Sequence, residues 1–173
     1  MRNREIFGSR VVELHGEIDD AAANRVVAQL LRFAAEEPRR DIHLFIESPG
    51  GSVTAGTAVY DAMTLVPCDV ATYTFGLAGG MAQFLLSAGA PDKRITVRGA
   101  RIVMRGPSFP RSDAHVDARL VRVRHTLSEL MAARIGHSPW RIRRDWDAER
   151  DFTAEEARAY GLVDRVHDHP PGV

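Results

Sequence analysis

The chain has few of the features that mark specialised classes of protein. Cys68 is its only cysteine, so no disulfide can form within the chain. Basic and acidic residues both number 23, and the formal net charge of zero indicates neither nucleic acid nor an anionic membrane as a partner. No apolar run approaches the roughly 18–20 residues that cross a bilayer, and the charged residues 1–5 precede no apolar signal region. We therefore expect a cytoplasmic protein.

The composition is that of an ordinary globular domain. Apolar residues make up 45% of the chain and charged residues 27%. A length of 173 residues is enough for one domain with a sizeable core. We expect a single domain over residues 1–173, with a short N-terminal segment at residues 1–9 and a loose tail at residues 167–173.

Short β-branched and apolar runs alternate with segments of helical spacing over most of the chain. Strands are predicted at residues 10–14, 42–46, within 67–75, at 95–97 and at 101–104. Helices are predicted from Asp19 or Asp20 to just before Pro38, after residue 51, through 84–86 and at 154–160. Glycine-rich residues 76–80 are predicted to form a turn before the third helix. This alternation predicts an α/β fold with a parallel sheet and right-handed crossovers.

The pattern changes over residues 113–135, where a long amphipathic helix is predicted. Its apolar stripe consists of Val116, Leu120, Val123, Leu127, Leu130 and Met131. Arginine and histidine occupy its other faces. We expect this helix to project from the body of the domain and to bury its stripe on another subunit. The alternative is that the stripe packs on the chain's own sheet.

Two glycine-containing stretches carry the most specific information in the sequence. Residues 48–51 (Ser-Pro-Gly-Gly) follow a predicted strand, and residues 76–81 (Gly-Leu-Ala-Gly-Gly-Met) precede an apolar helix. Further stretches occur in order at residues 52–56, 60–63, 82–90, 93–94 and 157–164. Together these stretches resemble ClpP, the proteolytic subunit of the Clp protease, from about Arg10 to Val166. The resemblance implies the ClpP/crotonase fold, which has stacked βαβ units and a protruding helical handle, here at about residues 113–135.

Active members of that family use a Ser-His-Asp triad, and the resemblance maps the triad onto unusual residues here. The serine position is Gly80 and the histidine position is Arg105. The aspartate position is Glu149 without a gap, or Asp151 with a gap of one residue. Gly80 supplies no hydroxyl or thiol for covalent catalysis. Arg105 has no acceptor lone pair and stays protonated in proteins, so it cannot act as a base. We therefore predict a pseudo-protease.

Other parts of such a site are expected to remain. In the family the backbone N–H groups of Gly51 and Met81 would form the oxyanion hole, which does not depend on a side chain. We expect either that Arg105 and Glu149 pair and close the pocket, or that both side chains reach solvent.

No replacement nucleophile is expected. Ser52 is predicted to cap a helix, Ser87 to face the core, and Cys68 to start a strand without a basic neighbour in sequence. The histidines show no metal-ligand spacing, and no cofactor or metal is expected.

The chain departs from the family in ways that bear on its partners. The short N-terminal segment is expected to weaken contact with an AAA+ unfoldase. Proline-containing residues 107–112 replace a glycine-rich strand, which is expected to weaken substrate binding and ring stacking. His43 and Phe45 fall in an outer docking pocket of the family, which we expect to be modified.

These observations lead to one preferred reading and three alternatives. The preferred reading is a non-catalytic subunit that forms heptameric rings, alone or as a hetero-oligomer with an active ClpP, and modulates that protease. The first alternative is an independent ring-forming binding protein. Weaker alternatives are an ATP-dependent serine peptidase or a crotonase-like acyl-thioester enzyme that uses an unrecognised site.

Overall fold

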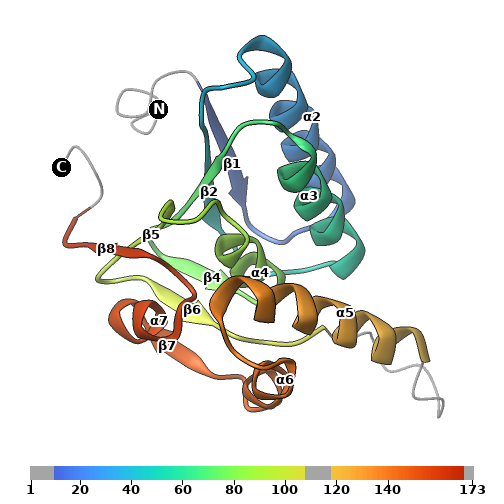
Figure 1. Cartoon of the computed structure of the whole chain (residues 1–173), viewed down its shortest axis with the longest axis vertical. Helices are drawn as coiled ribbons and strands as arrows, with labels where there is room; N and C mark the ends of the chain where they lie inside the picture. The colour runs from blue at the N-terminus through green and yellow to red at the C-terminus, as the bar shows by residue number, and fades with distance from the viewer. Residues whose placement is uncertain (1–9, 108–117, 170–173) are drawn as a thin grey trace.

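A computed structural model describes residues 10–107 and 118–169 of the chain. The expectations for residues 1–9, for most of residues 107–112 and for the end of the tail fall outside these residues. The described chain folds around a parallel five-stranded sheet in the order β1-β2-β3-β5-β8 (Figure 1). Its strands are β1 (Val11–His15), β2 (Ile42–Glu47), β3 (Val70–Thr74), β5 (Arg94–Val97) and β8 (Arg165–His167). The predicted α/β class and parallel sheet are confirmed.

Three helices connect the first strands, as predicted. They are α2 (Asp20–Glu36), α3 (Val53–Leu65) and α4 (Met81–Ser87). The predicted caps are present, because the side chain of Asp19 accepts from the N–H of Ala22 at 2.7 Å and that of Ser52 from the N–H of Ala55 at 3.2 Å. Helices α2 and α3 lie side by side against the sheet (Figure 1).

A second, three-stranded sheet was not predicted. It consists of β4 (Leu77–Gly79), β6 (Arg101–Val103) and β7 (Asp151–Thr153), with β7 antiparallel to β6. The expected turn at residues 76–80 is therefore wrong over 77–79, which form β4. The reason is that Ser48, just past β2, exchanges backbone hydrogen bonds of 2.9 and 3.0 Å with Leu77 and Gly79. This pairing joins the two sheets.

A single carboxylate shapes the chain where it passes from β3 to β4. Glu47, the last residue of β2, accepts hydrogen bonds from three consecutive backbone N–H groups. These come from Phe75 at 2.5 Å, Gly76 at 2.9 Å and Leu77 at 3.0 Å. Hydrogen bonds between a charged acceptor and backbone donors are among the stronger ones in proteins, so this carboxylate fixes the start of β4.

The long helix α5 (Ala118–Ile135) packs on its own chain over its C-terminal half. Leu127 and Met131 are 4% and 1% exposed and belong to the main core, and Val123 and Leu130 pack against that core. The expectation that this stripe is buried on another subunit is therefore wrong for Leu127 and Met131, whereas Val123 and Leu130 are only partly buried. The N-terminal end of α5 extends beyond the rest of the fold (Figure 1). Val116 and the side chain of Leu120 lie outside the described part.

The C-terminal region contains a helix that was missed, α6 (Pro139–Asp147), before α7 (Ala154–Tyr160). Its sequence is mostly charged, and Ile142 and Trp146 are the apolar residues that it buries. Helix α7 has the predicted bounds. His167 belongs to β8, so the expectation of a loose tail is wrong at that residue.

Candidate functional site

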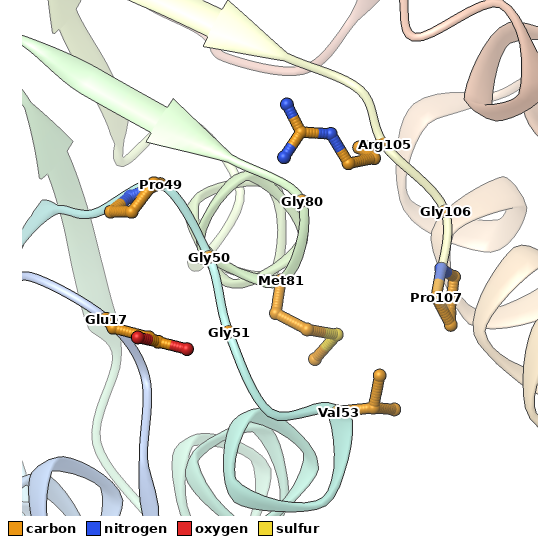
Figure 2. A pocket seen from close by; sticks show the side chains of 10 residues that line it. All are labelled: Glu17, Pro49, Gly50, Gly51, Val53, Gly80, Met81, Arg105, Gly106 and Pro107. Atoms are coloured by element: carbon orange, nitrogen blue, oxygen red, sulfur yellow. The ribbon is translucent and has the colours of Figure 1, made fainter. Parts of the chain in front are cut away.

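A pocket of about 300 Å³ lies where the carboxyl ends of three strands meet. Residues 49–51 follow β2, Gly80 follows β4, and Arg105 lies just past β6. The pocket is lined by Glu17, Pro49, Gly50, Gly51, Val53, Gly80, Met81, Arg105, Gly106 and Pro107 (Figure 2). Four residues that the sequence singled out, at positions 51, 80, 81 and 105, are thus brought together.

Glycines around the pocket allow separate backbone segments to touch. A Cβ atom on Gly51 would lie 2.5 Å from the carbonyl oxygen of Ile18, and one on Gly50 would lie 2.7 Å from that of Gly79. A Cβ on Gly79 would lie 2.8 Å from the carbonyl oxygen of Pro49. These distances are too short for any side chain, so the Pro-Gly-Gly turn and the end of β4 pack backbone against backbone.

Gly80 adopts a backbone conformation that L-residues rarely use. It has φ 50° and ψ −119° at the sharp turn from β4 into α4. Its N–H donates to the carbonyl of Val103 at 3.0 Å, and its own carbonyl accepts from the N–H of Phe84 at 3.0 Å. A Cβ atom at this position would approach only Arg105 and Pro49, at ordinary distances of 3.7 Å or more. A strained strand-to-helix turn of this kind exposes the nucleophile of many hydrolases, but here it carries no side chain.

Two backbone donors in the pocket find no acceptor among the described residues. The N–H groups of Gly51 and Met81 make no hydrogen bond to any residue in the described part of the chain. Gly50 lies against the second of them, because a Cβ on Gly50 would be 3.3 Å from the nitrogen of Met81. Such a pair of free N–H groups can bind a carbonyl oxygen or stabilise an oxyanion.

The structure brings Arg105 and Glu149 into contact as an ion pair. The distance from Nε of Arg105 to Oε1 of Glu149 is 3.6 Å, and the side chains are 49% and 64% exposed. The pairing expected in the first alternative is present, but both side chains also reach solvent, as the second alternative expected. A solvated pair at this distance is weak and leaves the pocket beside it open. The idea that the pair closes the pocket is therefore wrong. Asp151, the other candidate for the third position, pairs with Arg101 on the neighbouring strand.

The alternative nucleophiles lie outside the pocket. Ser52 caps α3, and Ser87 is 1% exposed and donates to the carbonyl of Leu162 at 3.1 Å. Cys68 is buried, and its Sγ lies 3.9 Å from a guanidinium nitrogen of Arg10. The expectation that Cys68 lacks a basic neighbour holds in sequence only, since the two residues are 58 positions apart. None of the described residues lining the pocket carries a hydroxyl, thiol or amine side chain.

A separate aromatic cluster lies on one face of the five-stranded sheet. Phe45 stacks on Tyr73 with ring centroids 4.6 Å apart, and Nδ1 of His43 lies 2.9 Å from the Tyr73 hydroxyl. Burial lowers the pKa of His43 and raises the pKa of Tyr73. The sequence singled out His43 and Phe45 but missed Tyr73, which is the register partner of Phe45.

Comparisons with known proteins agree with this architecture. A sequence profile of the family described as Clp protease matches residues 2–170. The chain is 46% identical over 166 residues to ATP-dependent Clp protease proteolytic subunit 2 of Corynebacterium efficiens, covering 93% of this chain and 83% of the relative. It is 46% identical over 167 residues to proteolytic subunit 3 of Streptomyces coelicolor, covering 94% and 77%. It is 43% identical over 166 residues to proteolytic subunit 2 of Mycolicibacterium paratuberculosis, covering 93% and 83%.

Within the described residues, no helix is long and apolar enough to span a bilayer. The mixed α/β architecture, the Pro-Gly-Gly turn packed against the end of β4, and a match over nearly the whole chain all lead to one assignment. The chain belongs to the Clp protease family.

Proposed function

We propose that this chain is a non-catalytic subunit of a Clp-type protease assembly. The observation that carries the proposal is the glycine at position 80, on a strand-to-helix turn that faces a pocket and has room for a side chain. Position 80 corresponds to the serine of active members, and glycine offers no atom for covalent attack. An acyl-enzyme cannot form there.

The residue next to this turn cannot supply the missing chemistry. A general base must accept a proton, and the Arg105 guanidinium has no free lone pair at any accessible pH. Its contact with Glu149 also differs from the carboxylate–imidazole pair of a triad, because a carboxylate beside arginine has no tautomer to orient. The loss of one triad member alone removes several powers of ten in rate, so peptide hydrolysis should be near background.

The free N–H groups of Gly51 and Met81 are consistent with a relic of an oxyanion hole. They do not argue for catalysis, because backbone donors persist whatever side chain occupies position 80. We propose that the chain enters rings with an active proteolytic subunit, changes its turnover, and contacts an AAA+ unfoldase weakly. Its relatives are named as numbered proteolytic subunits of ATP-dependent Clp proteases, which supports assembly with a second such subunit.

The first test is native mass spectrometry of the chain alone and mixed with an active Clp proteolytic subunit from the same cell, with peptidase turnover measured in parallel. A mixed oligomer with altered turnover supports the proposal. A homo-oligomer that does not associate with the active subunit and has no peptidase activity supports the alternative of an independent binding protein. Peptidase activity of the pure chain above background refutes the non-catalytic assignment.

A second test restores the missing groups. Gly80→Ser alone should not react with a fluorophosphonate probe, because Arg105 cannot deprotonate the new hydroxyl. Gly80→Ser combined with Arg105→His should recover weak labelling. The matched control is Gly80→Ala with Arg105→His, which has the base but no hydroxyl and should stay unlabelled. Strong labelling of the single variant would show that the assignment of the base position is wrong.

A further inference from the structure

The pocket beside Gly80 is lined by two backbone N–H groups that donate to no described residue and by an arginine whose guanidinium is only partly engaged. We propose that it binds the free C-terminal carboxylate of a peptide, held by the Arg105 guanidinium and the backbone N–H groups of Gly51 and Met81. This inference rests on the proposed function, because it treats the pocket as a binding site and not as a catalytic one.

The Arg105 guanidinium is only partly engaged. Its Nε faces Glu149 at 3.6 Å, beyond hydrogen-bond distance, and its two terminal nitrogens donate to no residue in the described part of the chain. About half of the side chain is exposed. Figure 2 shows it extending from the end of its strand toward the turn at Gly80. A guanidinium presents parallel N–H groups that match the two oxygens of a carboxylate, so these nitrogens are suited to that ligand.

The two backbone donors are fixed in place by packing, not by side chains. Gly51 is held against the backbone of Ile18, and the nitrogen of Met81 lies against Gly50. They belong to two chain segments far apart in sequence, and both line the same pocket as Arg105. A neutral carbonyl needs only the N–H groups, whereas a carboxylate uses the cation as well. The combination therefore favours a carboxylate over an amide.

The space that the ligand would occupy is left by the missing side chain. A Cβ atom at Gly80 would have no neighbour closer than 3.7 Å, and the nearest atoms belong to Arg105 and Pro49. Val53 lines this pocket and also a second cavity of about 550 Å³ between α3 and α5, where Leu127 and Leu130 contribute apolar surface. Because Val53 borders both spaces, an apolar cavity adjoins the pocket, which favours a peptide whose last side chain is apolar over a free inorganic anion.

Acidic side chains near the pocket limit the charge of the ligand. Glu17 also lines it, but in Figure 2 the Gly50–Gly51 backbone lies between its carboxylate and Arg105. Glu149 faces Arg105 and competes for its charge. The single carboxylate beside the Arg105 guanidinium leaves no excess of positive charge there, so directed hydrogen bonds must select the ligand. A singly charged carboxylate suits this site better than a phosphate.

The test compares two forms of one peptide on the full chain. The probes are N-acetyl-Ala-Ala-Leu as the free acid and as the C-terminal amide, with binding measured by isothermal titration calorimetry. We expect the acid to bind roughly tenfold or more tightly than the amide, the range expected for hydrogen bonds to a charged group. Equal affinities, or no binding of the acid at millimolar concentration, overturn the proposal without any need for a variant.

Variants then assign the preference to a residue. Arg105→Gln should remove the preference for the acid, whereas Arg101→Gln should retain it. Arg101 is also a solvated arginine paired with one carboxylate, that of Asp151, and it lies outside the pocket, so it is a suitable control. Glu149→Gln should tighten binding of the acid, because it removes the competing carboxylate. A preference that persists in Arg105→Gln overturns the role of this residue.

Cleavage of the amide peptide is measured in the same samples, which separates this inference from the proposed function. A chain that cleaves nothing and shows no preference for the acid refutes the carboxylate site and leaves the non-catalytic assignment standing. A chain that cleaves the peptide refutes the non-catalytic assignment and, with it, the view of the pocket as a binding site only.

Discussion

Replacing Gly80 by alanine should destabilise the chain moderately, although the new methyl group meets no obstacle. At φ 50° and ψ −119° an L-residue is strained by about 1–3 kcal/mol. The nearest neighbour of the added Cβ, at 3.7 Å, adds no steric cost. The lower entropy of the unfolded alanine chain offsets roughly 0.4–1 kcal/mol of this strain. The free energy of unfolding should therefore fall by about 1–2 kcal/mol, which lowers Tm by about 2–8 °C for a chain of this size.

Gly51→Ala is the informative comparison for this prediction. Gly51 also has a positive φ, 150°, but its Cβ would lie 2.5 Å from the carbonyl oxygen and 2.6 Å from the nitrogen of Ile18. Backbone strain and overpacking together should lower the free energy of unfolding by roughly 2–6 kcal/mol, because the backbone segments at Gly51 and Ile18 must move apart. Urea unfolding followed by circular dichroism, at one protein concentration for all variants, measures both effects. If Gly80→Ala is as stable as the parent chain, or less stable than Gly51→Ala, the reasoning about this turn is refuted.

Three further predictions concern polar and titratable contacts away from the pocket. Asp164→Ala should lower the free energy of unfolding, measured in urea, by about 3–5 kcal/mol. The reason is that Asp164 accepts hydrogen bonds from N and Nε of Arg94 at 2.9 Å and both side chains are largely buried. A decrease of less than about 1 kcal/mol would contradict this prediction. Burial and the 2.6 Å hydrogen bond to Asp145 raise the pKa of Tyr160 to about 12, so Tyr160→Phe should remove the tyrosine that ionises last in an ultraviolet pH titration. If the last step remains in that variant, the assignment is wrong. Burial lowers the pKa of His43 below 6.5, so its imidazole takes up a proton more readily in the unfolded chain than in the folded one. The contribution of His43 to the free energy of unfolding therefore falls as the pH drops below about 6.5, and it levels off below the pKa of the folded chain. His43→Gln should therefore lose less stability than the parent between about pH 7 and about pH 5, and an equal loss would contradict the sign of the shift.

Local signals in the sequence were enough to predict several elements closely. Helix α7 has the predicted bounds because Thr153 and Glu156 form a capping box at its start and Gly161 ends it in the left-handed conformation. Helix α6 was missed because its buried contacts come from Ile142 and Trp146 among charged neighbours, too few for a visible apolar stripe. Local pattern is therefore a good guide where caps are present and a poor one where burial is sparse.

The residues of the pocket were found in part. The glycine-containing stretches at residues 48–51 and 76–81, together with the resemblance to ClpP, brought Gly51, Gly80 and Met81 to notice. Their common location follows from the strands β2 and β4 that precede them. Glu17 lies in no motif, so nothing in the sequence pointed to it. Glu47 bonds to N–H groups 28–30 residues further along the chain, a contact that no local pattern encodes.

The backbone conformation at Gly80 makes some substitutions at this position easier to keep than others during evolution. Any L-residue placed there raises the free energy of the folded chain before it can contribute new chemistry, whereas a change to glycine lowers it. Selection for stability alone therefore favours glycine, and only selection for a reaction can keep a side chain at this turn. Once glycine occupies position 80, folding stability favours keeping it, even though an added Cβ atom would meet no neighbour closer than 3.7 Å.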